Sequence, residues 1–201
     1  MQLREALSIR EDRIREARRS HNIWLKERGH ELMPEIPANK FADHLQPMVL
    51  LSVNTGLRHG EVFALQWENI SFSKATLTVV GSTAKSGKTR HVPLNQEALA
   101  IMKQWRPSLD AAGLVFPAKD GENQFNNVRK AFLGMLEIAK ITSFRWHDMR
   151  HHFASKLVMA SVDLNTVREL LGHANLDMTL RYAHLAPEHK KQAVERLVAH
   201  G

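Results

Sequence analysis

The sequence predicts a mainly α-helical protein that carries one small antiparallel β-sheet. Most of the chain places apolar residues at the three- and four-residue spacing of amphipathic helices. Only residues 70–94 have the alternating, β-branched pattern of strands. With 201 residues, of which 43% are hydrophobic and 24% charged, the chain is long enough to bury a core and too apolar to be disordered.

The first forty residues predict a charged helical arm followed by a linker. Residues 2–31 are rich in helix formers and place apolar side chains at loosely helical spacing: Leu3, Leu7, Ile14, Ala17 and Trp24. Two prolines, Pro34 and Pro37, then prevent the helix from continuing. We therefore expect three parts: an arm and linker over 1–39, a main domain over 40–186, and a tail helix over 187–201.

The main domain is expected to begin with an apolar helix over 41–55, weakened by Pro47 and ended by Gly56. A short hairpin over 70–80 and a third strand over 90–94 follow, joined by a polar turn that exposes Lys85 and Lys88. The remaining predicted helices cover 95–105, 125–139, 146–160, 164–171, 178–184 and 187–199, and Gly172 gives the fourth of them a left-handed cap.

Charge and cysteine content narrow the classes of function. The 28 Lys and Arg residues exceed the 21 Asp and Glu residues, a net charge of +7 that favours a polyanionic partner such as nucleic acid. The absence of cysteine excludes disulfides, thiolate nucleophiles and cysteine zinc sites. Because no apolar run is long enough for a membrane span or a secretory signal, we expect a cytoplasmic protein with no membrane partner.

Three motifs contain side chains suited to phosphate chemistry. In the first, T-G-L-R-H-G-E over 55–61, a turn places Arg58 at the start of a short helix, where its guanidinium could bind two phosphate oxygens. Glu61 lies three residues further on and could hold that side chain by an ion pair. Taken alone, the motif more often describes a surface arginine beside a helix start.

The second motif, W-H-D-M-R-H-H-F over 146–153, places His147 and Arg150 on one face of a helix. We expect Trp146, Met149, Phe153 and Leu157 to form the buried stripe beside them, with His147 and Arg150 at its rim. The alternative is that His147 and His151, four residues apart, bind zinc or are merely solvated. Zinc is disfavoured because the motif lacks the glutamate of a His-Glu-x-x-His site and the chain has no cysteine ligand.

The third motif ends at the only tyrosine of the chain. Gly172 places His173 beyond a helix end, and Tyr182 follows nine residues later. A phenol that takes part in chemistry here can only be Tyr182, although a lone tyrosine in a helix is more often a packing residue.

Together these motifs resemble the tyrosine recombinases, the phage-integrase family. The resemblance covers about residues 41–187 and rests on T-G-L-R-H-G-E, the turn A-K-S-G over 84–87, H-D-M-R-H-H-F, and L-L-G-H followed by Tyr182. It implies the catalytic-domain fold of that family, double-stranded DNA as partner, assembly as a tetramer on DNA, and no cofactor, metal or ATP. It also implies an active-site set: Arg58, Lys85, His147, Arg150, His173 and Tyr182.

The resemblance further implies roles for these residues. Tyr182 would attack a DNA phosphodiester and form a 3′-phosphotyrosyl bond, with Arg58, Arg150 and His173 supplying positive charge. Lys85 would be the general acid, with Lys88 as the alternative lysine, and His147 the base or proton-relay partner of Tyr182. Lys88 and Arg90 are expected to contact the DNA backbone.

Other functions remain open at this point. A type IB topoisomerase would use a similar site to relax DNA, a non-catalytic DNA-binding protein could retain the fold, and a histidine metal site could support hydrolysis. Members of the resembled family usually carry a further N-terminal domain, whereas about 40 residues precede the main domain here. We therefore expect a fragment whose DNA binding is weak and strongly salt-dependent.

Overall fold

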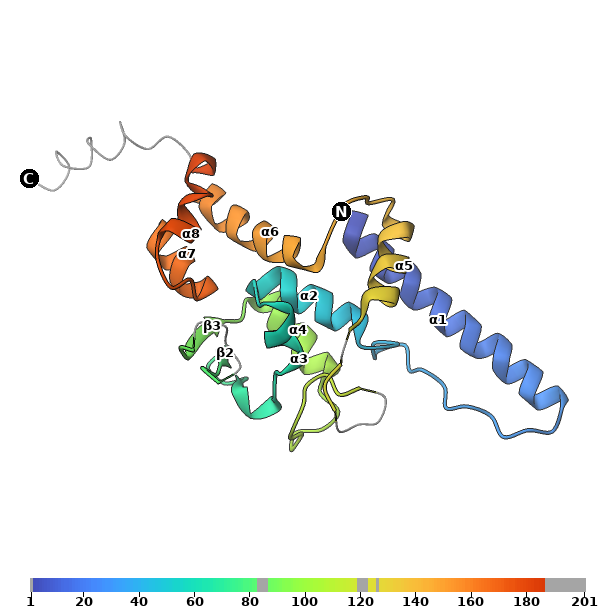
Figure 1. Ribbon diagram of the computed structural model, residues 1–201. Helices are drawn as coiled ribbons and strands as arrows, with labels where there is room; N and C mark the ends of the chain where they lie inside the picture. Colours follow the sequence, from blue (N-terminus) through green and yellow to red (C-terminus); the bar gives the residue numbers. More distant parts are fainter. Residues whose placement is uncertain (1, 83–86, 119–122, 126, 187–201) are drawn as a thin grey trace, which may run out of the picture.

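The computed structural model describes residues 2–82, 87–118, 123–125 and 127–186, and Lys85 and the predicted tail helix lie outside these ranges. Within them the chain is mainly helical and has one antiparallel sheet, which confirms the predicted fold class (Figure 1). The helices are α1 (Gln2–Glu27), α2 (Leu45–Thr55), α3 (His59–Phe63), α4 (Gln96–Trp105), α5 (Arg129–Ala139), α6 (Trp146–Met159), α7 (Leu164–Leu171) and α8 (Asp177–Leu180), with short 3₁₀ turns at Trp67–Asn69 and Ala183–Leu185.

The sheet consists of the three predicted strands, β1 (Ile70–Ser71), β2 (Thr76–Val79) and β3 (Arg90–Pro93), and their order in it is β1-β2-β3. All pairs are antiparallel, and Leu77 lies opposite Val92 on one side and Ile70 on the other. Burial alternates along β3, so that Arg90 shares the inward face with Val92. The sheet therefore turns one charged side chain toward the helices.

In the main domain, three predicted helices are shorter than expected by more than one residue. The helix predicted from residue 41 begins at Leu45, where the Asp43 carboxylate accepts a hydrogen bond from the Leu45 backbone N–H at 3.0 Å. Pro47 then falls in the first turn, where a backbone N–H is not needed, and is buried there. The helix predicted from residue 125 begins at Arg129, and the segment predicted over 178–184 divides into α8 and the 3₁₀ turn.

The main core surrounds α2, whose Leu45, Met48, Val49 and Leu51 are fully buried. This helix packs against α4 on one side and α6 on the other. A second, smaller cluster joins the far half of α6 to α7 and to Tyr182: Ala154, Val158, Val167, Leu171 and Tyr182. Because α6 contributes to both clusters, it connects the sheet-bearing part of the molecule to the segment that carries the tyrosine.

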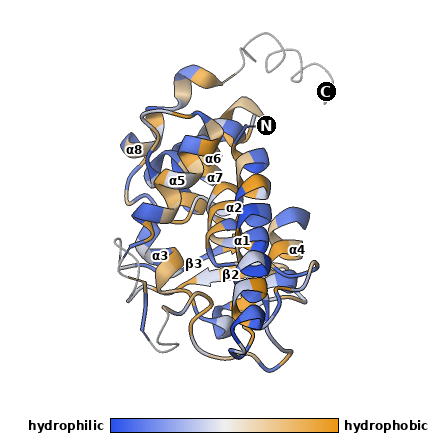
Figure 2. Ribbon diagram, turned by 90° about the vertical axis from the view of Figure 1, so that its right-hand side faces the viewer, coloured by the Kyte–Doolittle hydropathy of each residue, from blue (hydrophilic) through white to orange (hydrophobic). Residues whose placement is uncertain are grey.

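The helix α1 is attached to the main core at its first turns and projects away from it further along (Figure 1). Ala6 and Leu7 are buried in the same core as α5, whereas the outer part of α1 alternates hydrophilic and hydrophobic residues along its length (Figure 2). The boundary predicted near residue 40 remains a prediction.

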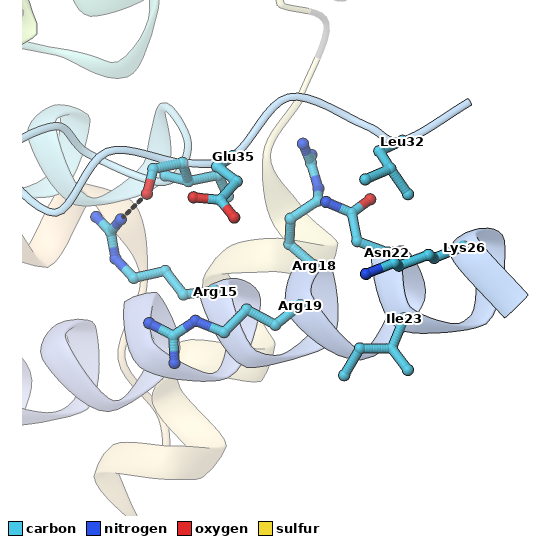
Figure 3. Close-up of a pocket in the computed structure, with 9 residues that line it drawn as sticks. Arg15, Arg18, Arg19, Asn22, Ile23, Lys26, Leu32 and Glu35 are labelled. Carbon is cyan, nitrogen blue, oxygen red and sulfur yellow. Dashed lines mark hydrogen bonds between the residues drawn. The ribbon is translucent and has the colours of Figure 1, made fainter. Parts of the chain in front are cut away.

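The segment that follows α1 runs back beside that helix. Arg15 donates to the carbonyl of Ile36 at 2.9 Å, and Arg18 donates to the carbonyl of Pro34 at 2.5 Å. Between the helix and the returning segment lies a pocket of about 340 Å³, whose lining combines Arg15, Arg18, Arg19 and Lys26 with apolar residues and Glu35 (Figure 3). Among the residues described, no helix is long and apolar enough to cross a membrane.

Candidate active site

Five of the six predicted active-site residues line a single pocket of about 640 Å³: Arg58, His147, Arg150, His173 and Tyr182. Arg58 is the N-cap residue of α3, and His147 and Arg150 lie on α6. His173 follows the C-cap of α7, and Tyr182 lies between α8 and the last 3₁₀ turn. The sixth residue, Lys85, lies outside the described residues. Lys88, the alternative lysine, is described and exposed just ahead of β3.

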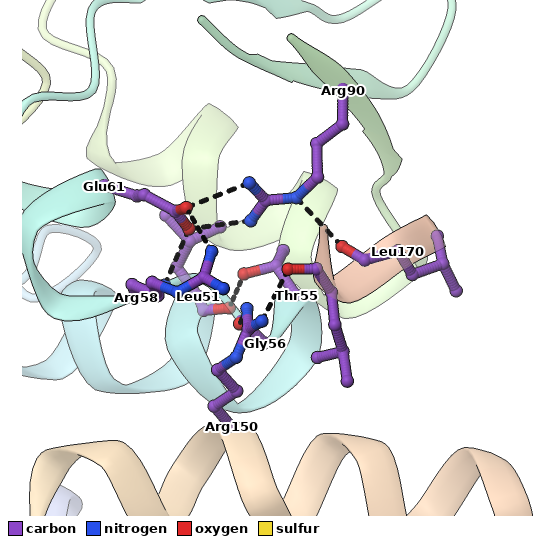
Figure 4. Close-up of polar contacts among 9 residues, drawn as sticks. Leu51, Thr55, Gly56, Arg58, Glu61, Arg90, Arg150 and Leu170 are labelled. Atoms are coloured by element: carbon purple, nitrogen blue, oxygen red, sulfur yellow. Dashed lines mark hydrogen bonds and ion pairs between the residues drawn. The ribbon is translucent and has the colours of Figure 1, made fainter. Parts of the chain in front are cut away.

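Glu61 holds Arg58 in place and is itself held by Arg90 (Figure 4). Its carboxylate accepts from the Arg58 backbone N–H at 2.8 Å and from the Arg58 guanidinium at 3.0 Å. Arg90 donates to both oxygens of the same carboxylate, at 2.9 and 2.7 Å. Burial raises the pKa of Glu61, but the Arg90 hydrogen bond and charge and the bonds from Arg58 outweigh it and leave the pKa lowered. Glu61 is therefore an anion shared between two arginines.

Arg90 points into the protein, whereas the sequence predicted that it would lie on the DNA-binding surface. We expected a contact to the DNA backbone, but its side chain is only 8% exposed and points inward from β3. Besides pairing with Glu61, its Nε donates to the carbonyl of Leu170 at 3.0 Å. Arg90 thus ties three parts of the site together: the sheet, the helix that begins after Arg58, and the end of α7. Unlike Arg58 and Arg150, Arg90 does not line the pocket, so its guanidinium is not presented to a phosphate bound there.

Arg150 is also inside the protein rather than at a rim, with 3% of the residue exposed. Its guanidinium donates to the carbonyl of Gly56 at 2.8 Å and to the carbonyl of Leu171 at 2.5 Å (Figure 4). Burial, followed by the nearby charge of Arg58, lowers the pKa of Arg150 to about 9, so the group remains cationic at neutral pH. Of the stripe predicted beside it, Met149 is fully buried and the other members are half-buried.

The two carbonyls that accept from Arg150 both lie at helix ends. One belongs to Gly56, which ends α2, and the other belongs to Leu171, which directly precedes Gly172 at the end of α7. Gly56 ends α2 with φ of 63° and Gly172 ends α7 with φ of 63°, so both have the left-handed conformation that the sequence predicts for Gly172. A Cβ on Gly56 would lie 2.5 Å from the ring of Phe153. A Cβ on Gly172 would lie 2.9 Å from the side chain of Arg90. Gly56 therefore lets the end of α2 approach Phe153 of α6, and Gly172 lets the end of α7 approach Arg90.

His173 is held by Thr179, with 2.8 Å between Nδ1 and Oγ1. Burial, and then the charges of Arg150 and Arg58, lower the pKa of His173 to about 4. At neutral pH its imidazole is therefore uncharged. In the DNA-free protein at neutral pH, the positive charge that we expected from three residues comes from Arg58 and Arg150, and His173 is a neutral hydrogen-bonding group.

The histidine that contacts Tyr182 is His151, and not the expected His147. The Tyr182 hydroxyl lies 2.5 Å from Nδ1 of His151. His147 is exposed, and its ring stands edge-on to that of His151 with 4.8 Å between centroids. The i, i+4 spacing of the two histidines was visible in the sequence, where it was interpreted as a possible zinc site or as two solvated positions. Among the described residues, no group of three or more His, Cys, Asp or Glu is arranged to hold a metal ion.

Tyr182 itself is buried, with 6% of the residue exposed. Its ring packs in the second core cluster, and the guanidinium of Arg181 lies 5.9 Å from the ring centroid. Burial raises the pKa of the phenol, while the charges of Arg181 and Arg150 act in the opposite direction. The phenol therefore remains protonated at neutral pH and needs a base to become a nucleophile.

The sequence matches the model of the phage integrase family over residues 22–189. It is 34% identical over 178 residues to the tyrosine recombinase XerA of Pyrococcus furiosus, covering 85% of this chain and 60% of that protein. It is 31% identical over 155 residues to the integrase of Salmonella phage P22, covering 72% of this chain and 40% of that protein.

Solved structures share the fold. The catalytic domain of bacteriophage HP1 integrase matches with a TM-score of 0.59 and 26% identity, over 74% of this chain and 79% of that one. XerH recombinase bound to its difH substrate matches with a TM-score of 0.61 and 23% identity, over 80% of this chain and 48% of that one. The chain spans 40–60% of the length of the relatives XerA and P22 integrase. The motifs, the fold and the family match agree: this chain belongs to the phage integrase family of tyrosine recombinases.

Proposed function

We propose that this chain cuts and rejoins DNA at specific sites through a covalent bond between DNA and Tyr182. The observation that carries the proposal is the convergence of Arg58, Arg150 and the sole tyrosine on one pocket. Phosphoryl transfer needs a nucleophile in line with the phosphorus atom and cations on the non-bridging oxygens. In this chain a phenol and two arginines line the same cavity, which supports the proposal.

The two arginines carry the electrostatic part of the reaction. Arg150 is fixed by two carbonyls and Arg58 by Glu61, so neither has to reorganise when negative charge develops on the phosphate. Each donor fixed in advance contributes about 3 kcal/mol of transition-state stabilisation. His173, uncharged at neutral pH in the DNA-free protein, would donate one hydrogen bond to the same phosphate through its Nε2.

Proton transfer is needed at both ends of the reaction. We assign the protonation of the departing 5′ oxygen to Lys85, because an ammonium group can donate a proton to the oxygen as it leaves. The product would be a 3′-phosphotyrosyl enzyme and a free 5′-hydroxyl. Because the phosphotyrosyl bond keeps the energy of the phosphodiester, rejoining to another 5′-hydroxyl would need neither ATP nor a metal ion.

The proposed partner is double-stranded DNA. The net charge of +7 supplies phosphate attraction, and the structurally similar XerH recombinase was solved bound to its difH substrate. Exchange of strands between two duplexes requires several copies of the site, and we propose a tetramer on DNA. Crosslinking on a synaptic DNA substrate, resolved by size, measures the number of copies.

The test is to trap the covalent intermediate. Duplex DNA containing the target site, nicked so that the released fragment diffuses away, is incubated with the protein, and adducts that resist denaturant are isolated. We expect the linked peptide to contain Tyr182 with DNA attached through its 3′ end. Tyr182→Phe should bind the same DNA with equal affinity and form no adduct. An adduct at another residue, or none with the wild-type chain, would refute the proposal.

A further inference from the structure

We propose that His151, and not His147, is the general base that activates Tyr182. This inference rests on the proposed function, because it assigns the proton of the attacking phenol. His151 does not belong to the active-site set that the sequence motifs predict.

Geometry favours His151 over its neighbours. Its Nδ1 lies 2.5 Å from the Tyr182 oxygen, within the distance at which a proton passes between two groups. The two rings lie 5.9 Å apart between centroids, and both side chains line the same pocket. His173, the other half-buried histidine of the pocket, is engaged with Thr179 through its own Nδ1.

The protonation state of His151 fits a base. Burial, followed by the charge of Arg181, lowers its pKa below the ordinary 6.5, so the ring is neutral at neutral pH and one ring nitrogen is free of a proton. Asp148 acts in the opposite direction but is outweighed. The titratable and charged groups around the ring are, from α6 and its N-cap, Arg145, His147, Asp148 and Arg150, and, from the segment after α8, Arg181 and Tyr182.

The proposed step balances protons and bonds. As the Tyr182 oxygen bonds to phosphorus, its proton passes to Nδ1 of His151. The bond between phosphorus and the 5′ oxygen breaks, and that oxygen takes a proton from the general acid, assigned above to Lys85. In rejoining, the incoming 5′-hydroxyl attacks phosphorus and gives its proton to the lysine, while His151 returns the proton to the tyrosine oxygen.

The first experiment compares His151→Asn with a matched control, His152→Asn, in single-turnover cleavage of the nicked substrate. An asparagine amide can keep a hydrogen bond to the phenol from near the position of Nδ1 but cannot take up a proton. His152 is the next residue of α6 and is exposed. We expect His151→Asn to cleave at least about 10²-fold more slowly with unchanged DNA affinity, and His152→Asn to match the wild type.

The pH profile separates a base from a structural contact. Wild-type cleavage should slow as pH falls through the pKa of His151, because the protonated ring no longer accepts a proton. That limb, below pH 6.5, should be missing in His151→Asn and present in His147→Asn. Thermal unfolding midpoints check that each variant is folded, and His151→Gln replaces the asparagine variant if that one is not.

The single tyrosine permits a more direct test. Growth on a fluorinated tyrosine changes only position 182, and fluorination lowers the pKa of the phenol. A more acidic nucleophile depends less on its base, so the substitution should raise the cleavage rate of His151→Asn at least about tenfold and leave the wild type nearly unchanged.

The outcomes distinguish this inference from the proposed function. Wild-type cleavage through Tyr182, with a slow His151→Asn variant that fluorination rescues, supports both. Wild-type cleavage with an unimpaired His151→Asn variant, or with a slow variant that keeps the acid limb and is not rescued, overturns the role of His151 alone. If the wild-type chain forms no adduct at Tyr182, both the proposed function and the role of His151 are refuted.

Discussion

Arg90 and Glu61 form a buried two-point ion pair that joins the sheet to the helix beginning after Arg58, with N to O distances of 2.9 and 2.7 Å. The Glu61 side chain is 2% exposed and that of Arg90 8% exposed, so solvent screens the pair only weakly. Because Glu61 also bonds Arg58, a change at Glu61 reaches a proposed catalytic group without touching DNA.

Replacing Glu61 by glutamine should destabilise the fold and slow cleavage. Two arginines would then face a neutral amide, and removing one partner of a buried pair costs about 3–5 kcal/mol. Urea unfolding measures the loss in free energy of unfolding, and single-turnover cleavage measures the effect on Arg58.

The matched control for this variant is Glu16→Gln. Glu16 pairs with Arg19 on the surface of α1, where both side chains are about 70% exposed (68% and 70%), and such a pair contributes about 0.5 kcal/mol or less. Equal losses of stability in the two variants would show that the Arg90 to Glu61 pair has no special structural role.

Gly56→Ala should be destabilising although it adds one methyl group. The residue has φ of 63°, which costs a non-glycine residue about 1–2 kcal/mol. The new Cβ would also lie 2.5 Å from the Phe153 ring, and forced repacking of that kind costs about 1–3 kcal/mol. Cleavage should fall as well, since the Gly56 carbonyl holds Arg150.

Gly134→Ala is the control, because it lies inside α5 with no heavy atom within 4 Å of its added Cβ. Alanine in a helix interior is favoured over glycine by about 1 kcal/mol, so this variant should be at least as stable as the wild type. Urea unfolding measures the free energy of unfolding of both variants. If Gly56→Ala were as stable as Gly134→Ala, our account of the turn at Gly56 would be contradicted.

The local sequence was enough to predict the sheet and both helix ends at the site. Alternating apolar residues gave three strands close to their observed bounds, and Gly56 and Gly172 marked turns that the structure confirms. Helix starts were less predictable. The start of α2 depends on a hydrogen bond from Leu45 to Asp43, and a proline weakens a helix only outside its first turn.

The roles of Arg90 and His151 depend on contacts between distant segments, which no local pattern contains. Arg90 meets Glu61 across 29 residues and Leu170 across 80. One signal was available for Arg90, since strand alternation places it on the same side as the apolar Val92. For His151 the helical spacing gave its face of α6, but only the folded chain brings Tyr182 to it across 31 residues.

His173 should titrate far below an ordinary histidine. Its pKa is about 4, against the ordinary 6.5, because of burial and the charges of Arg150 and Arg58. The imidazole resonances of His173 in an NMR titration measure this directly. Bound DNA should move the midpoint upward, since phosphate charge opposes that of the arginines. A midpoint at or above 6.5 in the free protein would contradict the arrangement described.

The same shift predicts how stability depends on pH. Between pH 6.5 and about 4 the unfolded chain binds a proton at His173 that the folded chain does not. This group therefore contributes stability that is present above pH 6.5 and is lost as pH falls through that window. The free energy of unfolding should fall less steeply in His173→Asn than in the wild type over that range, and identical slopes would argue against the shift.

Arg150→Lys should abolish most cleavage while leaving the charge in place. The guanidinium spans two carbonyls, of Gly56 and Leu171, which belong to different helix ends. An ammonium group is a point charge that cannot reproduce this planar two-sided contact, so the cation would no longer be fixed toward the phosphate. We expect a loss of about 10²–10³-fold in the single-turnover cleavage rate, the size seen when one oriented donor is removed from such a site. DNA affinity should change little, because most of it comes from phosphate contacts elsewhere on the basic surface.

The matched control is Arg19→Lys. It exchanges the same two residue types at a side chain that is 70% exposed on α1 and has no contact with the pocket around Arg150, so this variant should cleave at the wild-type rate. If Arg150→Lys cleaves as fast as Arg19→Lys, positive charge alone suffices and the two carbonyl contacts have no part in catalysis.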